Sequence, residues 1–291
     1  MMNNDIIVGI GEVLWDMFPE GKRIGGAPAN FAYHMSQFGF DSRVVSAVGE
    51  DVLGDEILEN FNEKGLRYWV ERVPFPTGTV EVTLNEGGIP CYEIKQSVAW
   101  DNVPYTPELD RLTRCVCFGS LAQRNVVTRT TLNRFLDAMS GEAYKVFDIN
   151  LRQHFYTMEV LKDSLVRCNL LKLNDEELVI LSELLELSEK SIEGKCWEMM
   201  KRFDLKVLIL TCGKQGSYVF SGDTRSFLDT PHVKVVDTVG AGDSFTAAFC
   251  AAILKGKSMV EAHRLAVEVS AFVCGQAGAM PRLPEKLKGI L

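Results

Sequence analysis

Short apolar runs alternate with helical patterns along the later part of the chain, and this alternation limits the possible folds more than any other feature. Four runs have the length of buried strands: 115–119, 145–149, 170–173 and 206–211. The segments between them have the length and amphipathic period of helices: 128–139, 158–167, 175–185 and 192–202. Parallel strands need long crossovers, so this order predicts an α/β fold with a central, mostly parallel sheet and helices on both faces.

The same alternation extends toward both ends of the chain. Before the four runs, we expect strands and helices at 6–11, 28–38, 42–49 and 51–64. After them, three short strands and two helices are expected at 217–220, 225–228, 233–236, 242–254 and 260–274. Glycines at 39 and 65 are placed to end the first two helices.

One stretch follows a different period. Between 79 and 95, apolar and polar residues alternate strictly on both sides of a turn at 85–88. This pattern predicts a hairpin with one solvent-exposed face, which does not belong in a buried parallel sheet. We therefore expect a small β appendage. Segment 12–20, in contrast, has no regular period.

Composition and charge exclude several classes of function. The formal net charge of −8 argues against a nucleic-acid partner, because binding to phosphate backbones requires an excess of Lys and Arg. The chain has no apolar run of about eighteen residues and no basic-then-apolar N-terminus, so no membrane partner is expected and we expect a cytoplasmic protein. Its eight cysteines form no C-x-x-C pair and its four histidines are scattered, which argues against a zinc site. The expected partner is a small molecule.

Segment 236–245 joins an expected strand to an alanine-rich helix through two glycines. Gly240 and Gly242 allow a tight turn, after which the N–H groups of the first helical turn form an anion site. Asp243 stands at the same point, and a carboxylate beside an anion site suits phosphoryl transfer from a nucleotide to an alcohol. The alternative is that Asp243 is only an N-cap and the glycines only a turn. The motif alone favours neither interpretation.

Asn174 and Glu177 follow the strand at 170–173 and open a helix. Their spacing is that of a capping box, which favours a structural role. The same two oxygen-bearing side chains can order magnesium and its waters near a nucleotide's phosphates. The two roles are compatible.

The strand at 145–149 ends in alternating polar residues, Asp148, Asn150 and Arg152. Along an extended backbone these side chains would point the same way and line one wall of a pocket at the carboxyl end of the sheet. The alternative is an ordinary polar strand end, and we weigh the two equally.

No phosphate-binding P-loop is present, because Ala251 replaces the glycine that the pattern requires before 256–258. A nucleotide must therefore be held in another way. Thr211, Gly213 and Gly216 leave a strand end, where the glycines either admit a nucleotide or make the next turn; we favour the turn.

A second glycine pair lies near the N-terminus. Gly25 and Gly26 allow a ligand to approach bare backbone, and Asn30 stands one turn into the following helix. Asp16 lies upstream. A carboxylate with a nearby amide can hold sugar hydroxyls through paired hydrogen bonds.

Taken in order, these motifs resemble the ribokinase, or PfkB, family of carbohydrate kinases over essentially the whole chain. Segments 25–30 and 237–243, Gly-Gly-Ala-Pro-Ala-Asn and Asp-Thr-Val-Gly-Ala-Gly-Asp, look like the two signatures of the family. The resemblance implies a single ribokinase-like α/β domain, residues 1–291, with a small β lid formed by about 12–24 and 77–100.

The resemblance also implies roles for individual residues. Asp243 would be the catalytic base, and the amides of 240–242 (Gly240, Ala241 and Gly242) the anion hole. The sugar would be bound by Asp16, Gly25, Gly26, Asn30, Asn150 and Arg152. The nucleotide and magnesium would be bound by Asn174, Glu177, Thr211, Gly213 and Gly216. A monovalent cation would lie near Asp237, Val239 and Gly278, although Gln276 stands where some ribokinases have arginine.

Within the family, segments 11–19 and 147–152 look most like bacterial fructokinases. We therefore expect a kinase dependent on ATP and Mg²⁺, with K⁺ as a candidate activator, that converts fructose to fructose 6-phosphate. The alternatives are a kinase for ribose, 2-keto-3-deoxygluconate or a nucleoside, or a non-catalytic sugar-sensing module. A homodimer formed through the lid is a candidate assembly.

Overall fold

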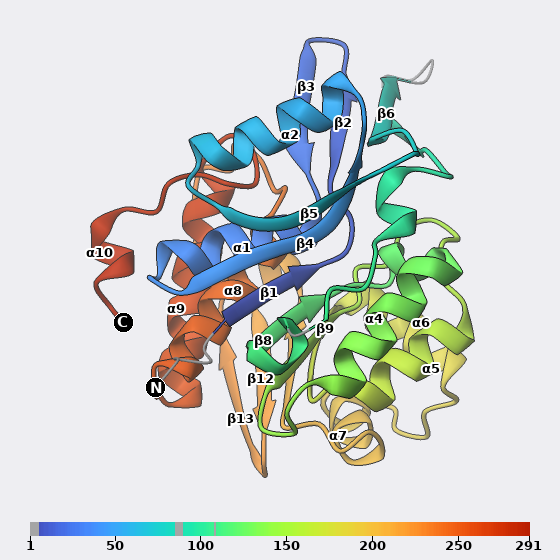
Figure 1. Cartoon of the computed structure of the whole chain (residues 1–291). Helices are drawn as coiled ribbons and strands as arrows, with labels where there is room; N and C mark the ends of the chain where they lie inside the picture. Colours follow the sequence, from blue (N-terminus) through green and yellow to red (C-terminus); the bar gives the residue numbers. More distant parts are fainter. Residues whose placement is uncertain (1–5, 85–89, 108) are drawn as a thin grey trace.

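The computed structural model describes residues 6–84, 90–107 and 109–291 (Figure 1). Within these residues, nine strands form one large sheet in the order β13-β12-β11-β10-β9-β8-β1-β4-β5. Their bounds are β1 (Ile6–Ile10), β4 (Asp41–Gly49), β5 (Arg67–Val73), β8 (Thr113–Phe118), β9 (Tyr144–Asp148), β10 (Leu170–Asn174), β11 (Val207–Thr211), β12 (Ser217–Ser221) and β13 (Thr224–Leu228). Neighbouring strands from β11 to β5 are parallel, and β12 and β13 add an antiparallel edge. The predicted mostly parallel sheet is confirmed.

Helices cover both faces of this sheet (Figure 1). One face carries α1 (Ala27–Gln37), α8 (Ala241–Leu254) and α9 (Met259–Cys274), and the other α4 (Val126–Ala138), α5 (Met158–Arg167), α6 (Asp175–Leu184) and α7 (Ile192–Arg202). The remaining described α-helices are α2 (Val52–Glu63), α3 (Leu109–Leu112) and α10 (Glu285–Lys288), and short 3-10 helices lie at Ala99–Asn102, Leu121–Arg124 and Gly213–Gln215. Adjacent residues of β1 face opposite sides, since Ile7 joins one buried cluster and Val8 the other. The apolar strands are therefore buried from both sides.

A second, small sheet lies at the top of Figure 1, beyond the large one. Its strands, in the order β3-β2-β6-β7, are β3 (Gly21–Gly25), β2 (Leu14–Phe18), β6 (Gly78–Leu84) and β7 (Pro90–Ile94). The hairpin expected at 79–95 is confirmed as the antiparallel pair β6 and β7, while its expected turn at 85–88 lies outside the described residues. The segment at 12–20 is not irregular, because β2 pairs in parallel with the sequence-distant β6. Its pairing partner, rather than its own periodicity, makes it a strand.

One further strand expectation was wrong, and one strand was missed. The valine-rich segment 233–236 forms no strand; Val235 and Val236 are 53% and 59% exposed, and the Val236 N–H donates to the Cys274 carbonyl at the end of α9. With no neighbouring strand to pair with, valine alternation alone does not make a strand. Strand β5 was not predicted, because much of its sequence is exposed at the sheet edge and lacks a continuous apolar run.

Helix α8 is one of the deeply enclosed elements near the site. Ten of its fourteen residues are buried, and its neighbours include α9 and α1. Such surroundings hold its N-terminus rigidly with respect to the sheet. Among the described residues, no helix has the length and apolar character required to span a bilayer.

Candidate active site

Asp243 and Asn30 meet where the N-terminus of α8 faces α1. The Asn30 Nδ2 atom donates a hydrogen bond of 2.7 Å to the Asp243 Oδ2 atom. Asn30 is 3% exposed, and it lies in the first turns of α1, directly after the Gly25–Gly26 pair. Residues more than two hundred positions apart in sequence therefore form one cluster. The two expected signatures come together at this bond.

The N-terminus of α8 is built as the sequence suggested, with one difference. Gly240 is the N-cap residue, its φ of 75° lies in the left-handed region, and no side chain caps the helix. Asp243 stands three residues further on, so the interpretation of Asp243 as an N-cap is wrong. An alanine at 240 would place its Cβ 2.6 Å from the Ala279 Cβ, which gives a second reason for glycine there. The uncapped first turn is suited to an anion.

The carboxyl group of Asp243 is tuned by its surroundings. Burial, together with the nearby Asp148 carboxylate, raises the pKa of Asp243 to about 6, while the Asn30 amide, Lys172 and Arg152 oppose this rise. Asp243 is therefore mostly ionised at neutral pH but is a stronger base than an exposed aspartate. Such a carboxylate can accept a proton from an alcohol.

Two of the residues expected to bind the sugar belong to the small sheet. Asp16 lies in β2, and Gly25 ends β3; a Cβ on Gly25 would lie 2.7 Å from the Asp16 Oδ2 atom. Gly26 has a φ of 122°, and a Cβ there would lie 2.4 Å from the Glu12 carbonyl oxygen. Burial raises the pKa of Asp16 to about 6, with Arg152 and Arg23 opposing the rise. Gly25 thus makes room for the Asp16 carboxylate, and Gly26 for the Glu12 backbone carbonyl.

The loop after β9 departs from the expected geometry. Asn150 has a φ of 48°, so the backbone is not extended and Asp148, Asn150 and Arg152 do not line one wall by simple alternation. Asp148 instead points into the core, where it accepts hydrogen bonds from Lys172 Nζ (3.1 Å) and Thr246 Oγ1 (3.2 Å). Arg152 remains close enough to lower the pKa values of Asp16 and Asp243.

Asn174 and Glu177 form the expected capping box. The Glu177 Oε2 atom accepts the Asn174 N–H at 2.8 Å, and Asn174 Oδ1 accepts the Glu177 N–H at 2.8 Å. The other carboxylate oxygen, Oε1, accepts the Leu151 N–H at 2.9 Å. Each oxygen keeps a further lone pair. The arrangement fits a carboxylate that accepts hydrogen bonds from the waters of a magnesium ion without giving up its cap.

The two glycines after β11 differ from each other. A Cβ on Gly216 would lie 2.5 Å from the Leu228 carbonyl oxygen, so this glycine is needed for the turn into β12 and β13. Gly213 has a φ of 51°, and a Cβ there would meet nothing within 4 Å. The Thr211 hydroxyl donates a hydrogen bond of 3.5 Å to the Leu173 carbonyl oxygen. Of these three, Gly213 has the open backbone that a nucleotide can approach.

Asp237 connects two loops. Its Oδ1 accepts the Val239 N–H at 3.0 Å, and its Oδ2 accepts the Gly278 N–H at 3.2 Å. The Nη1 atom of Arg23, in β3, lies 3.5 Å from the Asp237 Oδ2 atom and links this loop to the small sheet. The three residues that the family resemblance grouped are therefore neighbours.

Sequence reasoning missed two buried charged residues of the site, Glu12 and Lys172. Glu12 is 3% exposed; burial raises its pKa to about 7, with the Asp243 charge adding to the rise and Arg152 opposing it. Lys172 is 7% exposed and is paired with Asp148. For Lys172 the sequence did contain a signal, a single charged residue inside an otherwise apolar strand, Leu-Leu-Lys-Leu.

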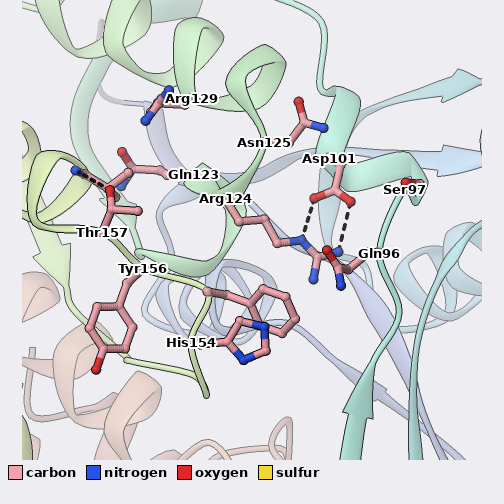
Figure 2. A pocket seen from close by; sticks show the side chains of 12 residues that line it. Gln96, Ser97, Asp101, Gln123, Arg124, Asn125, Arg129, His154, Tyr156 and Thr157 are labelled. Carbon is pink, nitrogen blue, oxygen red and sulfur yellow. Dashed lines mark hydrogen bonds and ion pairs between the residues drawn. The ribbon is translucent and has the colours of Figure 1, made fainter.

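A separate polar pocket of about 230 Å³ lies beside the base of the small sheet (Figure 2). Arg124 makes two hydrogen bonds to Asp101, of 2.7 and 2.9 Å, and stacks over Trp100 and Phe155. Figure 2 shows this ion pair on one side of the pocket and Tyr156 and Thr157 on the other. The Arg124 Nη2 atom also donates to the Lys95 carbonyl at 2.6 Å, whereas Nη1 is buried without a hydrogen-bond partner among the described residues. We interpret the ion pair and the ring contacts as structural support for the small sheet.

The mostly parallel sheet with helices on both faces and a small second sheet is a ribokinase-like α/β fold, and a carboxylate stands at the uncapped N-terminus of α8. The chain belongs to the pfkB family of carbohydrate kinases, whose model matches residues 19–286.

Individual relatives agree with this class. An uncharacterized sugar kinase from Pyrococcus horikoshii is 28% identical over 97% of this chain and 95% of its own length. Its crystal structure in complex with ATP has a TM-score of 0.83 at 25% identity, and the match covers 99% of this chain and 100% of that one. An ATP-dependent 6-phosphofructokinase from Thermoanaerobacterium thermosaccharolyticum is 27% identical over 96% of this chain and 91% of its own.

A solved fructokinase has the same fold. The Vibrio cholerae enzyme, crystallised with fructose, ADP and calcium ion, has a TM-score of 0.83 at 22% identity over 99% of this chain and 98% of that one. The relatives carry names for different acceptors, so the comparisons do not select a single sugar.

Proposed function

We propose that this protein transfers the γ-phosphate of ATP to D-fructose to give fructose 6-phosphate, with Asp243 as the general base. The observation that carries the proposal is the hydrogen bond between Asn30 and Asp243, because it joins the sugar-side glycine pair to the anion site of α8. A base at this junction lies between an acceptor hydroxyl and a transferring phosphate.

Asp16, the Gly25–Gly26 pair and Asn30 orient the sugar in this proposal. Asp16 accepts two hydroxyl hydrogen bonds, and Gly25 leaves room for its carboxylate. Asn150 and Arg152 complete the acceptor site from the loop after β9. Holding the hydroxyl beside Asp243 removes much of the entropic cost of the reaction.

Asp243 then takes the proton of the bound hydroxyl. Its raised pKa, about 6, keeps it ionised at neutral pH while it remains basic enough to share the proton as the new bond forms. The N–H groups around Gly240, Ala241 and Gly242 face the charge that develops on the transferred phosphate. In this proposal Asp243 accepts the proton, and the backbone N–H groups stabilise the charge on the phosphate.

The nucleotide end is formed by Asn174, Glu177, Thr211 and Gly213, with Gly216 fixing the turn. Magnesium, when bound, neutralises charge on the phosphates. Glu177 orders its waters through the lone pairs that the cap leaves free. Asp237 and the backbone of Val239 are the proposed site for K⁺.

Fructose is favoured over the other acceptors by two supports. The segments at 11–19 and 147–152 look most like bacterial fructokinases, and the Vibrio cholerae enzyme of the same fold is named for fructose. Ribose, 2-keto-3-deoxygluconate and nucleosides are the alternative acceptors, and a non-catalytic sugar sensor is the alternative class. We infer that the protein works in the cytoplasm as a soluble enzyme.

The test is ADP release by the wild-type protein, measured with magnesium and potassium across fructose, fructose 6-phosphate, ribose, 2-keto-3-deoxygluconate and adenosine. We expect the highest kcat/KM for fructose. A tenfold preference for another acceptor, about 1.4 kcal/mol, would contradict the fructokinase assignment and leave the kinase intact. If no acceptor stimulated ADP release, the sensor alternative would take its place.

A further inference from the structure

Lys172 is a buried lysine in a central strand of the large sheet. Its side chain is 8% exposed, and its Nζ atom donates to Asp148 Oδ1 at 3.1 Å. Lysines are rarely buried to this extent without a function or a compensating network, because removing the ammonium from water is costly. The proposed reaction assigns this residue no role so far.

The Nζ atom of Lys172 also lies against the first turn of α8. A Cβ built on Gly242 would be 2.9 Å from Nζ. In an α-helix the Cα–Cβ bond tilts toward the N-terminus, so the ammonium lies beside the end of α8 where the free N–H groups are. Gly242 itself is only half-buried, so this turn is open to a ligand. The Lys172 ammonium is therefore adjacent to the first turn of α8.

The two glycines of this turn have different reasons to be glycine. Gly240 has a left-handed φ of 75°, which a side chain disfavours. Gly242 has no such backbone requirement, since it lies within α8 and is absent from the residues with positive φ. What a side chain at 242 would meet is the Lys172 ammonium. Gly242 is thus the residue that lets Lys172 reach the helix end.

The Lys172 ammonium is paired with a buried carboxylate. Its Nζ atom donates to Asp148 Oδ1 at 3.1 Å, and the two side chains are 8% and 5% exposed. Asp148 is itself held by the Thr246 hydroxyl. The ammonium is therefore a fixed positive charge with a fixed position.

We propose that Lys172 is a further catalytic residue, whose ammonium contacts the transferred phosphoryl group beside Gly242. This inference rests on the proposed phosphoryl transfer but not on the identity of the sugar. In that step the acceptor oxygen bonds to the γ-phosphorus, and the bond from the γ-phosphorus to the bridging oxygen breaks with its electron pair leaving on ADP. The hydroxyl proton goes to Asp243. Lys172 exchanges no proton and stabilises the charge on the phosphoryl oxygens.

The test compares the double variant Lys172→Met/Asp148→Asn with the single variant Asp148→Asn. Lys172→Met alone would leave Asp148 as an unpaired buried charge and can fail to fold, whereas the double variant removes both charges. We expect the double variant to lose about a hundredfold or more in kcat relative to the single variant, with KM values for fructose and MgATP within about threefold. Equal kcat values for the single and double variants would overturn the role of Lys172.

A binding measurement separates a catalytic role from a structural one. Calorimetry would compare MgADP alone with MgADP plus aluminium fluoride and fructose, a mimic of the transferring phosphoryl group. The double variant should bind the mimic at least tenfold more weakly than Asp148→Asn does, with MgADP affinity nearly unchanged. Equal weakening of both ligands would overturn the inference.

Failure of the proposed function gives a different result. In that case the wild-type protein releases no ADP in response to any acceptor, which overturns both proposals. Sugar-dependent ADP release at the same rate in all three proteins overturns only the role of Lys172.

Discussion

The two ends of the candidate site are built on different parts of the fold. The phosphate end stands on α8, which is buried on nearly all sides between α1, α9 and the large sheet. The acceptor end draws Asp16 and Gly25 from the small sheet and Asn30 from α1. The position of the phosphate end is fixed by packing in the core, and that of the acceptor end depends also on strand pairing in the small sheet. The chemistry is therefore easier to infer from the sequence than the choice of sugar.

The largest expected effect concerns the phosphate end. Asp243→Asn keeps the size of the side chain but cannot accept a proton, so turnover should fall about a hundredfold to ten-thousandfold. Affinity for MgADP and the circular dichroism spectrum should stay near those of the wild type. A folded variant whose kcat remained within about threefold of wild type would remove Asp243 from the role of base.

The acceptor end should respond in KM and kcat/KM for the sugar but not in nucleotide binding. Asp16→Ala removes two charge-assisted hydrogen bonds, each contributing about 1.5–3 kcal/mol, so kcat/KM for fructose should fall by about a hundredfold or more. Asp223→Ala, at an exposed position between β12 and β13, is the matched control and should behave like the wild type. Equal losses in sugar and nucleotide binding would show that Asp16 supports the fold instead.

Glu177→Gln separates the capping role from the magnesium role. Because both carboxylate oxygens accept backbone N–H groups, glutamine keeps one of these bonds and loses the other, at a cost of about 1 kcal/mol. We expect a slightly lower melting temperature and a several-fold higher magnesium requirement. Glu261→Gln alters the matching capping box of α9 and should leave the magnesium requirement unchanged. An unaltered magnesium titration in Glu177→Gln would restrict this residue to capping.

A smaller effect is expected in stability. Burial raises the pKa of Glu12 from 4.5 to about 7, so the protonated form favours folding and its contribution is lost as pH rises through about 7. Glu12→Gln should therefore melt higher relative to the wild type at pH 8 than at pH 5. Thermal melts of both proteins at the two pH values measure this difference, and a difference independent of pH would contradict the raised pKa.

Local patterns predicted most of the large sheet and all of the helices that cover it. The apolar runs and the alanine-rich α8 carry their own signals in sequence. Where long-range pairing decides the structure, prediction failed: β2 depends on β6, and segment 233–236 has no partner strand. A local pattern does not specify a partner distant in the chain.

The candidate site divides in the same way. The residues at helix and strand ends, Asp243, Asn174 and Glu177, were predicted from motifs, and the structure places them at those ends. Lys172 was missed because its partners, Asp148 and Gly242, come from other elements. The left-handed backbone at Asn150 also cannot be derived from alternation of polar residues.

The most direct test of the central claim is the pH dependence of kcat/KM for fructose, with ADP measured in stopped samples so that no coupling enzyme limits the range. Burial and Asp148 raise the pKa of Asp243 to about 6, and only the ionised carboxylate can accept the hydroxyl proton. We predict a kcat/KM that is constant above about pH 7 and falls at least tenfold per pH unit below about 6, because the Asp16 carboxyl also has a pKa of about 6. A kcat/KM that stays constant down to pH 5 would contradict the role of Asp243 as the base.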